Sequence, residues 1–392
     1  MKTVQINAVY GHGSTGIIVS EISRMLTENN IENYVFYTGR KCSEKNKISY
    51  MGDFGVKLNA LIAKVMGNYG FNTHIGTAKL IGDLEKINPD VIHLHNIHGH
   101  NLNLNTFFKY LKRKNIRVIW TFHDCWAFTG YCTHFEFLPC EKWKKECSNC
   151  PQKATYSWFF DKSGKQFLKK KELFCSLPDM TIVTPSNWLA KLVKSSCLKD
   201  FPVEVINNGI DLDIFKHRNT ESTDGFGERR VILGMPKGTL AGFLELNKIL
   251  DKTKYKLVLA GLSENEIDAL PDDITGIKRT TNRDELAGIY SMADVFVNFT
   301  MEDTFPTVNL EALACGTPIV TYRTGGSPET IDENTGIVVD QGDTEATYKA
   351  IQEICNGPSR KEACIKRAHD LYNAKERFAE YLELYLKKGR FE

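Results

Sequence analysis

The chain has 392 residues, of which 50 are Lys or Arg and 48 are Asp or Glu. This length exceeds the size at which one hydrophobic core stops growing, so we expect two domains. The nearly balanced charge argues against nucleic acid as the main partner, because nucleic-acid-binding proteins carry a marked basic excess. The local run Lys169, Lys170 and Lys171 is interpreted as a solvated helix face.

The first segment, MKTVQINAVY, alternates apolar and polar residues, which predicts a core strand and not a signal peptide. The sequence contains no apolar run of about 18 residues, the length that crosses a bilayer. A peripheral membrane contact with a lipid-linked substrate remains compatible with these observations. We therefore expect a cytoplasmic protein, with the inner face of the membrane as its alternative location.

Short apolar runs alternate with longer amphipathic stretches, which is the pattern of an α/β protein with parallel sheets. In the first half we expect strands at residues 4–10, 34–37, 91–95, 118–122, 180–184 and 203–206. In the second half we expect strands at residues 230–234, 255–260, 276–280, 295–299, 319–322 and 337–339.

The segment NNGIDLDIF and the polar stretch through Gly225 and Gly227 indicate a domain boundary. We place one domain at residues 1–207 and the next at residues 208–372. A C-terminal helix at residues 373–392 is expected to pack back across both domains. The apolar residues near this end recur at helical spacing, and they are Leu371, Phe378, Leu382 and Tyr385.

A glycine loop separates the first strand from the first helix. It contains Gly11, Gly13 and Gly16, and Ser14 or Thr15 is the expected helix cap. Glycines at a helix N-terminus let backbone amides approach an anion. A phosphate or sugar contact and a simple tight turn explain this loop equally well. Its spacing differs from GxGxxG, which disfavours an NAD enzyme.

Two histidine-rich segments, HLHNIHGHN and FHDCW, follow predicted strands. Open α/β sheets bind ligands beyond the carboxyl ends of their strands, so we expect both segments to face a cleft. For His98 and His100, hydrogen bonds to local backbone groups are an alternative explanation to a role in the cleft. His123 lies between a strand and Asp124, and it is our candidate site residue.

Five of the eleven cysteines fall within residues 125–150. Four of them match the tetrahedral preference of zinc, and they are Cys132, Cys140, Cys147 and Cys150. In the absence of an export signal, the cluster favours a metal over disulfides. We predict a structural zinc that stabilises the loop at residues 125–151, with unligated thiols as the alternative. Cys125 is a fifth candidate ligand, and His134 could replace one sulfur.

The tract at residues 302–329 is the most informative part of the chain. A strand ends shortly before Asp303 and a helix begins near Thr307. The first amides of that helix, at Thr307 and Val308, can bind a diphosphate, and Glu311 can accept hydrogen bonds from ribose hydroxyls. Ordinary strand-to-helix turns would not explain two acidic residues at this spacing.

The same tract ends with TGGSPE after another strand. Gly325 and Gly326 allow close backbone approach, and Ser327 begins a further short helix. Lys237 follows the first strand of the second domain, where its ammonium group could contact phosphate oxygens. On its own, Lys237 is only a surface lysine.

Together these motifs resemble the retaining glycosyltransferases of family 4, which adopt the GT-B fold of two facing Rossmann-like domains with an interdomain cleft. The features that match in order are the glycine loop, PDVIHLHN, FHD, TPSNWL, NNGID, the Lys237-Gly238 pair, the segment from Asp303 to Glu311, and TGGSPE. The cysteine tract is similar to that of a bacterial subset associated with capsular polysaccharide, exopolysaccharide or lipopolysaccharide assembly.

The resemblance implies a hexosyltransferase (EC 2.4) that uses a nucleotide-diphosphate sugar as donor, retains the anomeric configuration and needs no catalytic metal. The donor would bind mainly to the second domain, and a glycan or polyprenyl-linked acceptor mainly to the first. The resemblance implies that Glu311 binds ribose, that Asp303 and His123 approach the donor sugar, that Lys237 contacts phosphate, and that Gly13 lies in a loop over the donor.

Two features depart from the family pattern. Asp303 replaces a glutamate and is one methylene shorter. The segment MPKG lacks the basic residue that often precedes the lysine, and Arg230 or Arg323 is a candidate to replace it. The alternative functions are a nucleotide-sugar epimerase of the same architecture and a noncatalytic nucleotide-sugar-binding subunit.

Overall fold

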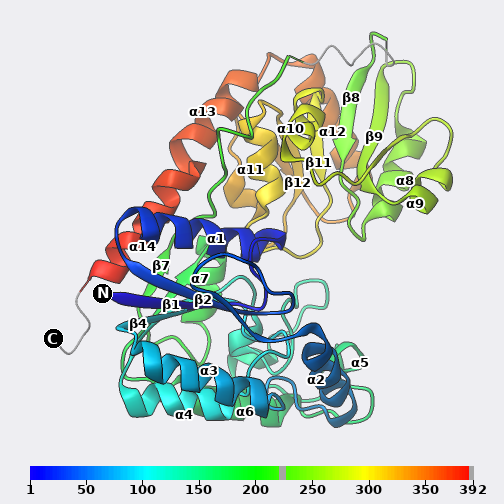
Figure 1. The fold of residues 1–392 in the computed structure, drawn as a ribbon. Coiled ribbons are helices and arrows are strands. Elements are labelled where there is room, and N and C mark those ends of the chain that lie inside the picture. Colours follow the sequence, from blue (N-terminus) through cyan, green and yellow to red (C-terminus); the bar gives the residue numbers. More distant parts are fainter. Residues whose placement is uncertain (220–226, 388–392) are drawn as a thin grey trace. The chain divides into compact units, whose positions relative to one another are not determined.

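The computed structural model describes residues 1–219 and 227–387, which divide into two compact units (Figure 1). Unit 1 comprises Met1–Asn207 and the chain from Phe378 onward, and unit 2 comprises Asn208–Arg377. Gly225, which the sequence assigned to a polar linker, lies outside the described residues. In the described part of the chain, no helix is long and apolar enough to cross a bilayer.

Unit 1 contains a seven-stranded parallel sheet in the order β3-β2-β1-β4-β5-β6-β7. Its strands are β1 (Lys2–Ile6), β2 (Glu32–Thr38), β3 (Lys47–Met51), β4 (Val91–Leu94), β5 (Arg117–Thr121), β6 (Met180–Thr184) and β7 (Val203–Val205). The direction of strand succession reverses between β1 and β4, which pair with Ile6 opposite Leu94. In open α/β sheets such a reversal is the usual place for a ligand.

The helices of unit 1 connect these strands. They are α1 (Gly13–Glu28), α2 (Asp53–Met66), α3 (His74–Ile87), α4 (Leu104–Lys114), α5 (Lys153–Tyr156), α6 (Ser163–Phe174) and α7 (Asn187–Lys194), with 3-10 turns η1 (Trp126–Phe128) and η2 (Lys142–Lys144). In α4, apolar residues at 104, 107, 108 and 111 are buried, and the Asn103 side chain caps the first turn by accepting a hydrogen bond from the Thr106 amide.

Unit 2 contains a six-stranded parallel sheet in the order β10-β9-β8-β11-β12-β13. Its strands are β8 (Arg230–Gly234), β9 (Tyr255–Leu262), β10 (Thr275–Lys278), β11 (Val295–Asn298), β12 (Ile319–Tyr322) and β13 (Gly336–Val339). Its helices are α8 (Leu240–Ile249), α9 (Glu264–Asp268), α10 (Arg283–Ser291), α11 (Thr307–Ala314), η3 (Ser327–Thr330), α12 (Thr344–Asn356) and α13 (Lys361–Tyr372). The succession reverses between β8 and β11, as it does between β1 and β4.

The last helix, α14 (Ala374–Leu386), carries a buried aromatic stripe in the part that belongs to unit 1. The hydroxyl of Tyr385 lies 2.6 Å from Nδ1 of His93, and the hydroxyl of Tyr381 lies 3.2 Å from Oγ1 of Thr121. These contacts attach α14 to β4 and β5. Leu371, which the spacing placed in the same stripe, is 40% exposed on α13, so this expectation was wrong.

The two ends of unit 2 are hydrogen-bonded to each other. The amide of Ile210 donates to the carbonyl of Tyr372 at 2.7 Å, and the amide of Ala374 donates to the carbonyl of Ile210 at 3.0 Å. A Cβ atom on Gly209 would lie 2.5 Å from the Cα atom of Ala374. Glycine is therefore required where these two segments meet.

The predicted fold class, two α/β units with parallel sheets, is confirmed, and a strand lies at or overlaps each predicted position. The sequence analysis missed β3, an edge strand in which only Ser49 and Tyr50 are buried, so it has no continuous apolar run. The first strand ends at Ile6 and not near residue 10, because the Asn7 side chain binds the carbonyl of Val9 and the amide of Asn96.

Candidate functional site

Two loops leave the carboxyl ends of β8 and β11, the strands at the reversal point of unit 2. The first loop holds Lys237, whose side chain is exposed and whose amide donates to the carbonyl of Met235 at 2.9 Å. Gly238 follows with a positive φ of 77°, a conformation that favours glycine. The second loop leads through Asp303 into α11. Because β8 and β11 are parallel neighbours, both loops begin at the same edge of the sheet.

The N-terminus of α11 offers backbone amides to an anion. The helix begins at Thr307 after Pro306, and no side chain caps it. Amides in a first helical turn have no carbonyl one turn earlier to bind, and the helix dipole adds partial positive charge there. Thr307 and Val308 are thus suited to bind phosphate oxygens, in the position that the sequence indicated.

Glu311 lies one turn into α11 and has an unusual environment. Its Oε2 atom accepts a hydrogen bond of 2.8 Å from the hydroxyl of Tyr290, which is fully buried. Burial raises the pKa of the Glu311 carboxyl from 4.5 to about 7, while the Tyr290 hydroxyl and the positive charge of Arg283 oppose this rise. Tyr290 and Arg283 lie on α10, and the sequence analysis did not identify either of them as a neighbour of Glu311.

Asp303 is in direct backbone contact with Gly326, the second residue of the pair Gly325 and Gly326. The amide of Gly326 donates to the carbonyl of Asp303 at 3.2 Å, and the Asp303 carboxylate accepts from the amide of Phe305 at 2.9 Å. Gly325 has a positive φ of 53°. Ser327 then begins η3, a 3-10 turn of four residues, where the sequence predicted a short helix.

A buried polar network holds these loops together, and the sequence analysis missed it. The amide group of Asn309 donates to Oγ1 of Thr330 at 2.9 Å and to Oγ of Ser327 at 3.3 Å, while its oxygen accepts from Asn298 at 2.8 Å. The hydroxyls of Ser327 and Thr321 lie 2.8 Å apart. The network joins α11, η3 and the ends of β11 and β12, so it fixes the positions of the loops that follow them. Asparagine inside an apolar helix pattern was the available signal.

The two arginines proposed to assist Lys237 occupy different ends of the sheet. Arg230 begins β8 and forms an ion pair of 2.8 Å with Asp294, whereas Lys237 follows the opposite end of β8. This position excludes Arg230 as the assisting residue. Arg323 follows β12 at the carboxyl edge and pairs with Asp340 at 2.9 Å. Arg323 therefore remains a candidate.

The glycine loop of unit 1 follows β1 and enters α1. Gly11 and Gly13 have positive φ values of 72° and 66°, and a Cβ atom on either would meet no other atom within 4 Å. Backbone conformation, and not lack of space, therefore favours glycine. Helix α1 begins at Gly13 with His12 in the capping position and no side-chain cap, so the expectation that Ser14 or Thr15 caps it was wrong.

Three histidines with neighbouring rings, His93, His95 and His123, lie at the carboxyl ends of β4 and β5. His95 Nδ1 lies 3.2 Å from His123 Nε2, and His93 contacts both the Tyr385 hydroxyl and Thr121 Oγ1 at 2.6 and 2.8 Å. Burial lowers the pKa of His93 to about 3 and that of His123 to about 4. His123 is therefore a neutral imidazole at neutral pH, so it can exchange hydrogen bonds without carrying charge.

His98 and Asp124 form a pair beside these histidines. Nε2 of His98 lies 2.7 Å from the carboxylate of Asp124, whose other oxygen accepts from the amide of Trp126 at 2.8 Å. Burial alone would raise the pKa of Asp124, but His98 and the Trp126 amide hold it below its ordinary value. His98 thus binds a carboxylate, whereas His100 packs its ring 4.5 Å from that of Tyr69.

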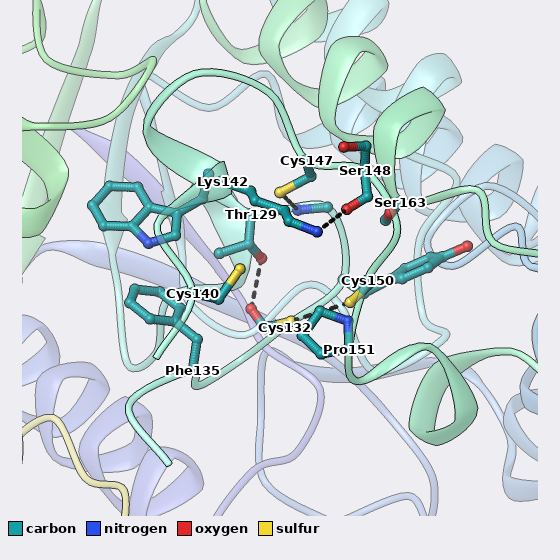
Figure 2. A pocket seen from close by; sticks show the side chains of 13 residues that line it. Thr129, Cys132, Phe135, Cys140, Lys142, Cys147, Ser148, Cys150, Pro151 and Ser163 are labelled. Carbon is teal, nitrogen blue, oxygen red and sulfur yellow. Dashed lines mark hydrogen bonds between the residues drawn. The ribbon is translucent and has the colours of Figure 1, made fainter. Parts of the chain in front are cut away.

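The four predicted zinc ligands line one pocket in the loop between β5 and β6, together with Phe135 and Trp143 (Figure 2). Cys132 Sγ and Cys150 Sγ lie 3.8 Å apart, and the amide of Gly130 donates to Cys147 Sγ at 3.2 Å. Cys140 is partly exposed on the same pocket. Cys125, the fifth candidate, is buried in the hydrophobic core of unit 1 instead.

This arrangement falls short of a formed metal site. Within residues 1–219 and 227–387, no three His, Cys, Asp or Glu side chains are close enough together to hold a metal ion. A cation does lie near the loop: the Lys170 ammonium donates to the carbonyl of Trp126 at 2.6 Å and lies 3.9 Å from the centre of its ring. Lys170 is only 1% exposed, so the interpretation of residues 169–171 as a solvated helix face was wrong for this residue.

Two family models match the chain. The model of Glycosyltransferase Family 4 matches residues 15–214, and that of Glycosyl transferases group 1 matches residues 236–356. The first match alone covers about half of the chain. Together the two models contain the histidine-rich segments, the cysteine loop and the segment from Lys237 to Gly326.

The chain is also similar to individual proteins. It is 23% identical over 328 residues, 76% of each chain, to WcaC of Escherichia coli (strain K12), which is named for a glycosyl transferase role in colanic acid biosynthesis. Sucrose-phosphate synthase from Thermosynechococcus elongatus has the same fold, with a TM-score of 0.71 and 16% identity over 98% of both chains. HepE from Anabaena, solved in complex with UDP, has a TM-score of 0.63 and 13% identity, with 98% of this chain and 99% of that chain covered.

Proposed function

Because the chain belongs to glycosyltransferase family 4 and is therefore a glycosyltransferase, we propose that it transfers a sugar from a nucleotide-diphosphate sugar to a glycan or lipid-linked acceptor. We further propose that the sugar keeps its anomeric configuration. The similarity to WcaC favours bacterial surface polysaccharide synthesis as the setting. A polyprenyl-linked acceptor would bring the protein to the inner face of the membrane.

The observation that carries this proposal is the arrangement at α11. Uncapped helix amides at Thr307 and Val308 are followed one turn later by a partly buried carboxylate, Glu311. A diphosphate needs several hydrogen-bond donors, and a ribose offers hydroxyl donors to an acceptor. Donors and an acceptor at this separation suit a nucleoside diphosphate, and HepE, a protein of the same fold, was solved with UDP.

Lys237 would stabilise the negative charge that builds on the leaving diphosphate, since an ammonium group placed on phosphate oxygens binds the transition state more tightly than the ground state. Asp303 and the neutral His123 would contact the donor sugar. The backbone at Gly325 and Gly326 would pass close to the donor, because glycine has no side chain to hinder the approach. This set of groups would need no catalytic metal.

A thermal-shift series with UDP-, GDP- and CDP-sugars tests donor binding, because a ligand that binds only the folded state raises the melting temperature. The stabilising donor is then incubated with a short-chain polyprenyl-linked sugar, and the product is examined by NMR. An inverted anomeric signal would refute retention. Epimerised donor formed without acceptor would indicate an epimerase, and donor binding without transfer to a broad acceptor panel would indicate a binding subunit.

We also propose that the cysteine loop holds a structural zinc after small side-chain rotations. Two sulfurs bound to one tetrahedral zinc at about 2.3 Å lie roughly 3.8 Å apart. Cys132 and Cys150 have this separation, and two further thiols line the same pocket. An amide bonded to a ligand sulfur, as at Cys147, is a typical outer contact of such sites.

Elemental analysis of protein purified without added metal tests the zinc. About one equivalent is expected, and less than about half an equivalent in folded protein would contradict the proposal, because structural zinc binds tightly. Cys150→Ser should lose the metal. Cys42→Ser, at a cysteine of unit 1 outside this loop, should retain it.

A further inference from the structure

Helix α2 presents an apolar face to solvent. Of its residues, only Ala63 is buried, whereas Phe54 is 81% exposed, Leu58 46% and Leu61 49%. Ile62 and Met66 are exposed as well. Residues 54, 58, 62 and 66 recur at intervals of four, and residue 61 lies three positions after 58, so they share one face of the helix. A helix on a soluble monomer normally packs such a face against its own core.

A cluster of exposed aromatic residues adjoins this helix. Trp158, Phe159 and Phe160 are 51%, 64% and 53% exposed. The amide of Trp158 donates to the carbonyl of Lys64 in α2 at 2.9 Å, and α5, which precedes the cluster, lies beside α2 in unit 1 (Figure 1). The exposed apolar residues of α2 and these three aromatic residues therefore form one surface, which we call the α2–Trp158 surface.

The charges around the α2–Trp158 surface are predominantly positive. Lys57 and Lys64 are exposed on α2, and the Lys64 ammonium lies 6.0 Å from the Trp158 ring. The Lys162 ammonium lies 5.4 Å from the Phe160 ring. Two carboxylates are exposed here as well: that of Asp53 in the first turn of α2, and that of Asp161, which accepts from the amides of Cys150 and Ser163. The three lysines outnumber them.

We propose that the α2–Trp158 surface docks unit 1 on an anionic phospholipid bilayer, with α2 lying in the plane of the interface. Tryptophan and phenylalanine partition into the boundary between headgroups and acyl chains, while lysines at its edge reach the lipid phosphates. A second copy of the chain fits this surface less well, because the lysines of two copies would face each other. The inference rests on the proposed function, since a polyprenyl-linked acceptor is presented at a bilayer.

Sedimentation of the whole protein with vesicles tests the proposal. Wild-type protein should bind vesicles of phosphatidylethanolamine and phosphatidylglycerol more tightly than vesicles of phosphatidylcholine alone. The pair Phe54→Gln and Leu58→Gln removes two apolar anchors and should weaken the partition coefficient by on the order of tenfold or more. Leu371→Gln, a helical leucine of similar exposure in unit 2, is the matched control and should bind like wild type.

The charge contribution is tested separately. Lys57→Gln with Lys64→Gln should weaken binding to the anionic vesicles by on the order of tenfold and leave binding to phosphatidylcholine unchanged. Equal binding of wild type and the Phe54→Gln, Leu58→Gln pair would overturn the proposal, as would absence of wild-type binding. A dimer in analytical ultracentrifugation that the same pair disperses would also overturn it, because a second copy would then cover the surface.

Thermal shifts with nucleotide sugars on the same variants separate this inference from the proposed function. The substituted residues of the α2–Trp158 surface all lie in unit 1, and Leu371 is an exposed residue of α13, so donor stabilisation should match wild type in every variant. Vesicle binding without any response to nucleotide sugars would contradict the proposed function alone. Donor response without vesicle binding would contradict the docking proposal alone.

Discussion

Replacing Glu311 by Gln is expected to stabilise unit 2 and to weaken nucleotide binding. Burial raises the pKa of this carboxyl from 4.5 to about 7 in the folded protein. Between these pH values the folded chain keeps a proton that the unfolded chain has released, so the free energy of unfolding falls as pH rises. The difference corresponds to roughly 3 kcal/mol above pH 7. Glutamine keeps the shape and the Tyr290 contact but never ionises, so it should recover most of this loss.

Donor binding should change in the opposite direction. Under the proposed function, ribose hydroxyls of the donor donate to the Glu311 carboxylate, so binding should favour the ionised form and release its proton. The affinity of the wild type should then fall by up to about tenfold for each pH unit below 7. Glu311→Gln should bind the donor about tenfold more weakly near pH 8, with little pH dependence. His123 should not contribute to this profile, because burial holds its pKa at about 4.

Chemical denaturation of wild type and Glu311→Gln near pH 5, 7 and 8 measures the stability, and calorimetry with UDP-glucose measures the affinity if the donor is a UDP-sugar. Glu362→Gln, at an exposed carboxylate on α13 of the same unit, is the matched control and should change neither quantity. The reasoning is refuted if Glu311→Gln is no more stable than wild type near pH 8, or if its gain in stability does not shrink toward pH 5.

Four further substitutions test the fold and the site. Gly209→Ala should destabilise the protein by about 1–3 kcal/mol in thermal unfolding, because its methyl group would overlap the backbone of Ala374. Gly288→Ala, in an open helical position, should stabilise the protein by roughly 0.5–1 kcal/mol. Asn309→Ala should lower the free energy of unfolding by about 1–3 kcal/mol, since it leaves buried polar partners unsatisfied. It should also weaken donor binding. Unchanged donor affinity would show that the network does not position the donor site. Lys237→Ala should lower kcat in a transfer assay while the melting temperature stays at the wild-type value, because the side chain is exposed.

The sequence predicts the buried strands well because each is a short apolar run bounded by turn residues. It does not reveal β3, because a strand at the edge of the sheet needs few buried residues. It also locates Asp303, Glu311 and the pair Gly325 and Gly326 in one tract. The sequence can group these residues because they are close together in the chain.

Contacts between segments that are distant in the chain could not be predicted from local sequence patterns. The hydroxyl of Tyr290 reaches Glu311 from a helix 21 positions earlier, and Tyr385 reaches His93 across 292 positions. In the sequence Lys170 is part of a run of three lysines, and only the packing of Trp126 against it reveals that it is buried. Pairing of this kind depends on tertiary packing, which spacing along one chain does not specify.

The backbone bridge between Ile210 and Asn373 brings the two ends of unit 2 together. Residues near its two ends meet, so the intervening segment can be excised or exchanged at one joint without separating its ends. Under the proposed function, a related nucleotide-binding unit whose termini also meet, grafted at the same joint, would exchange donor preference while unit 1 is retained.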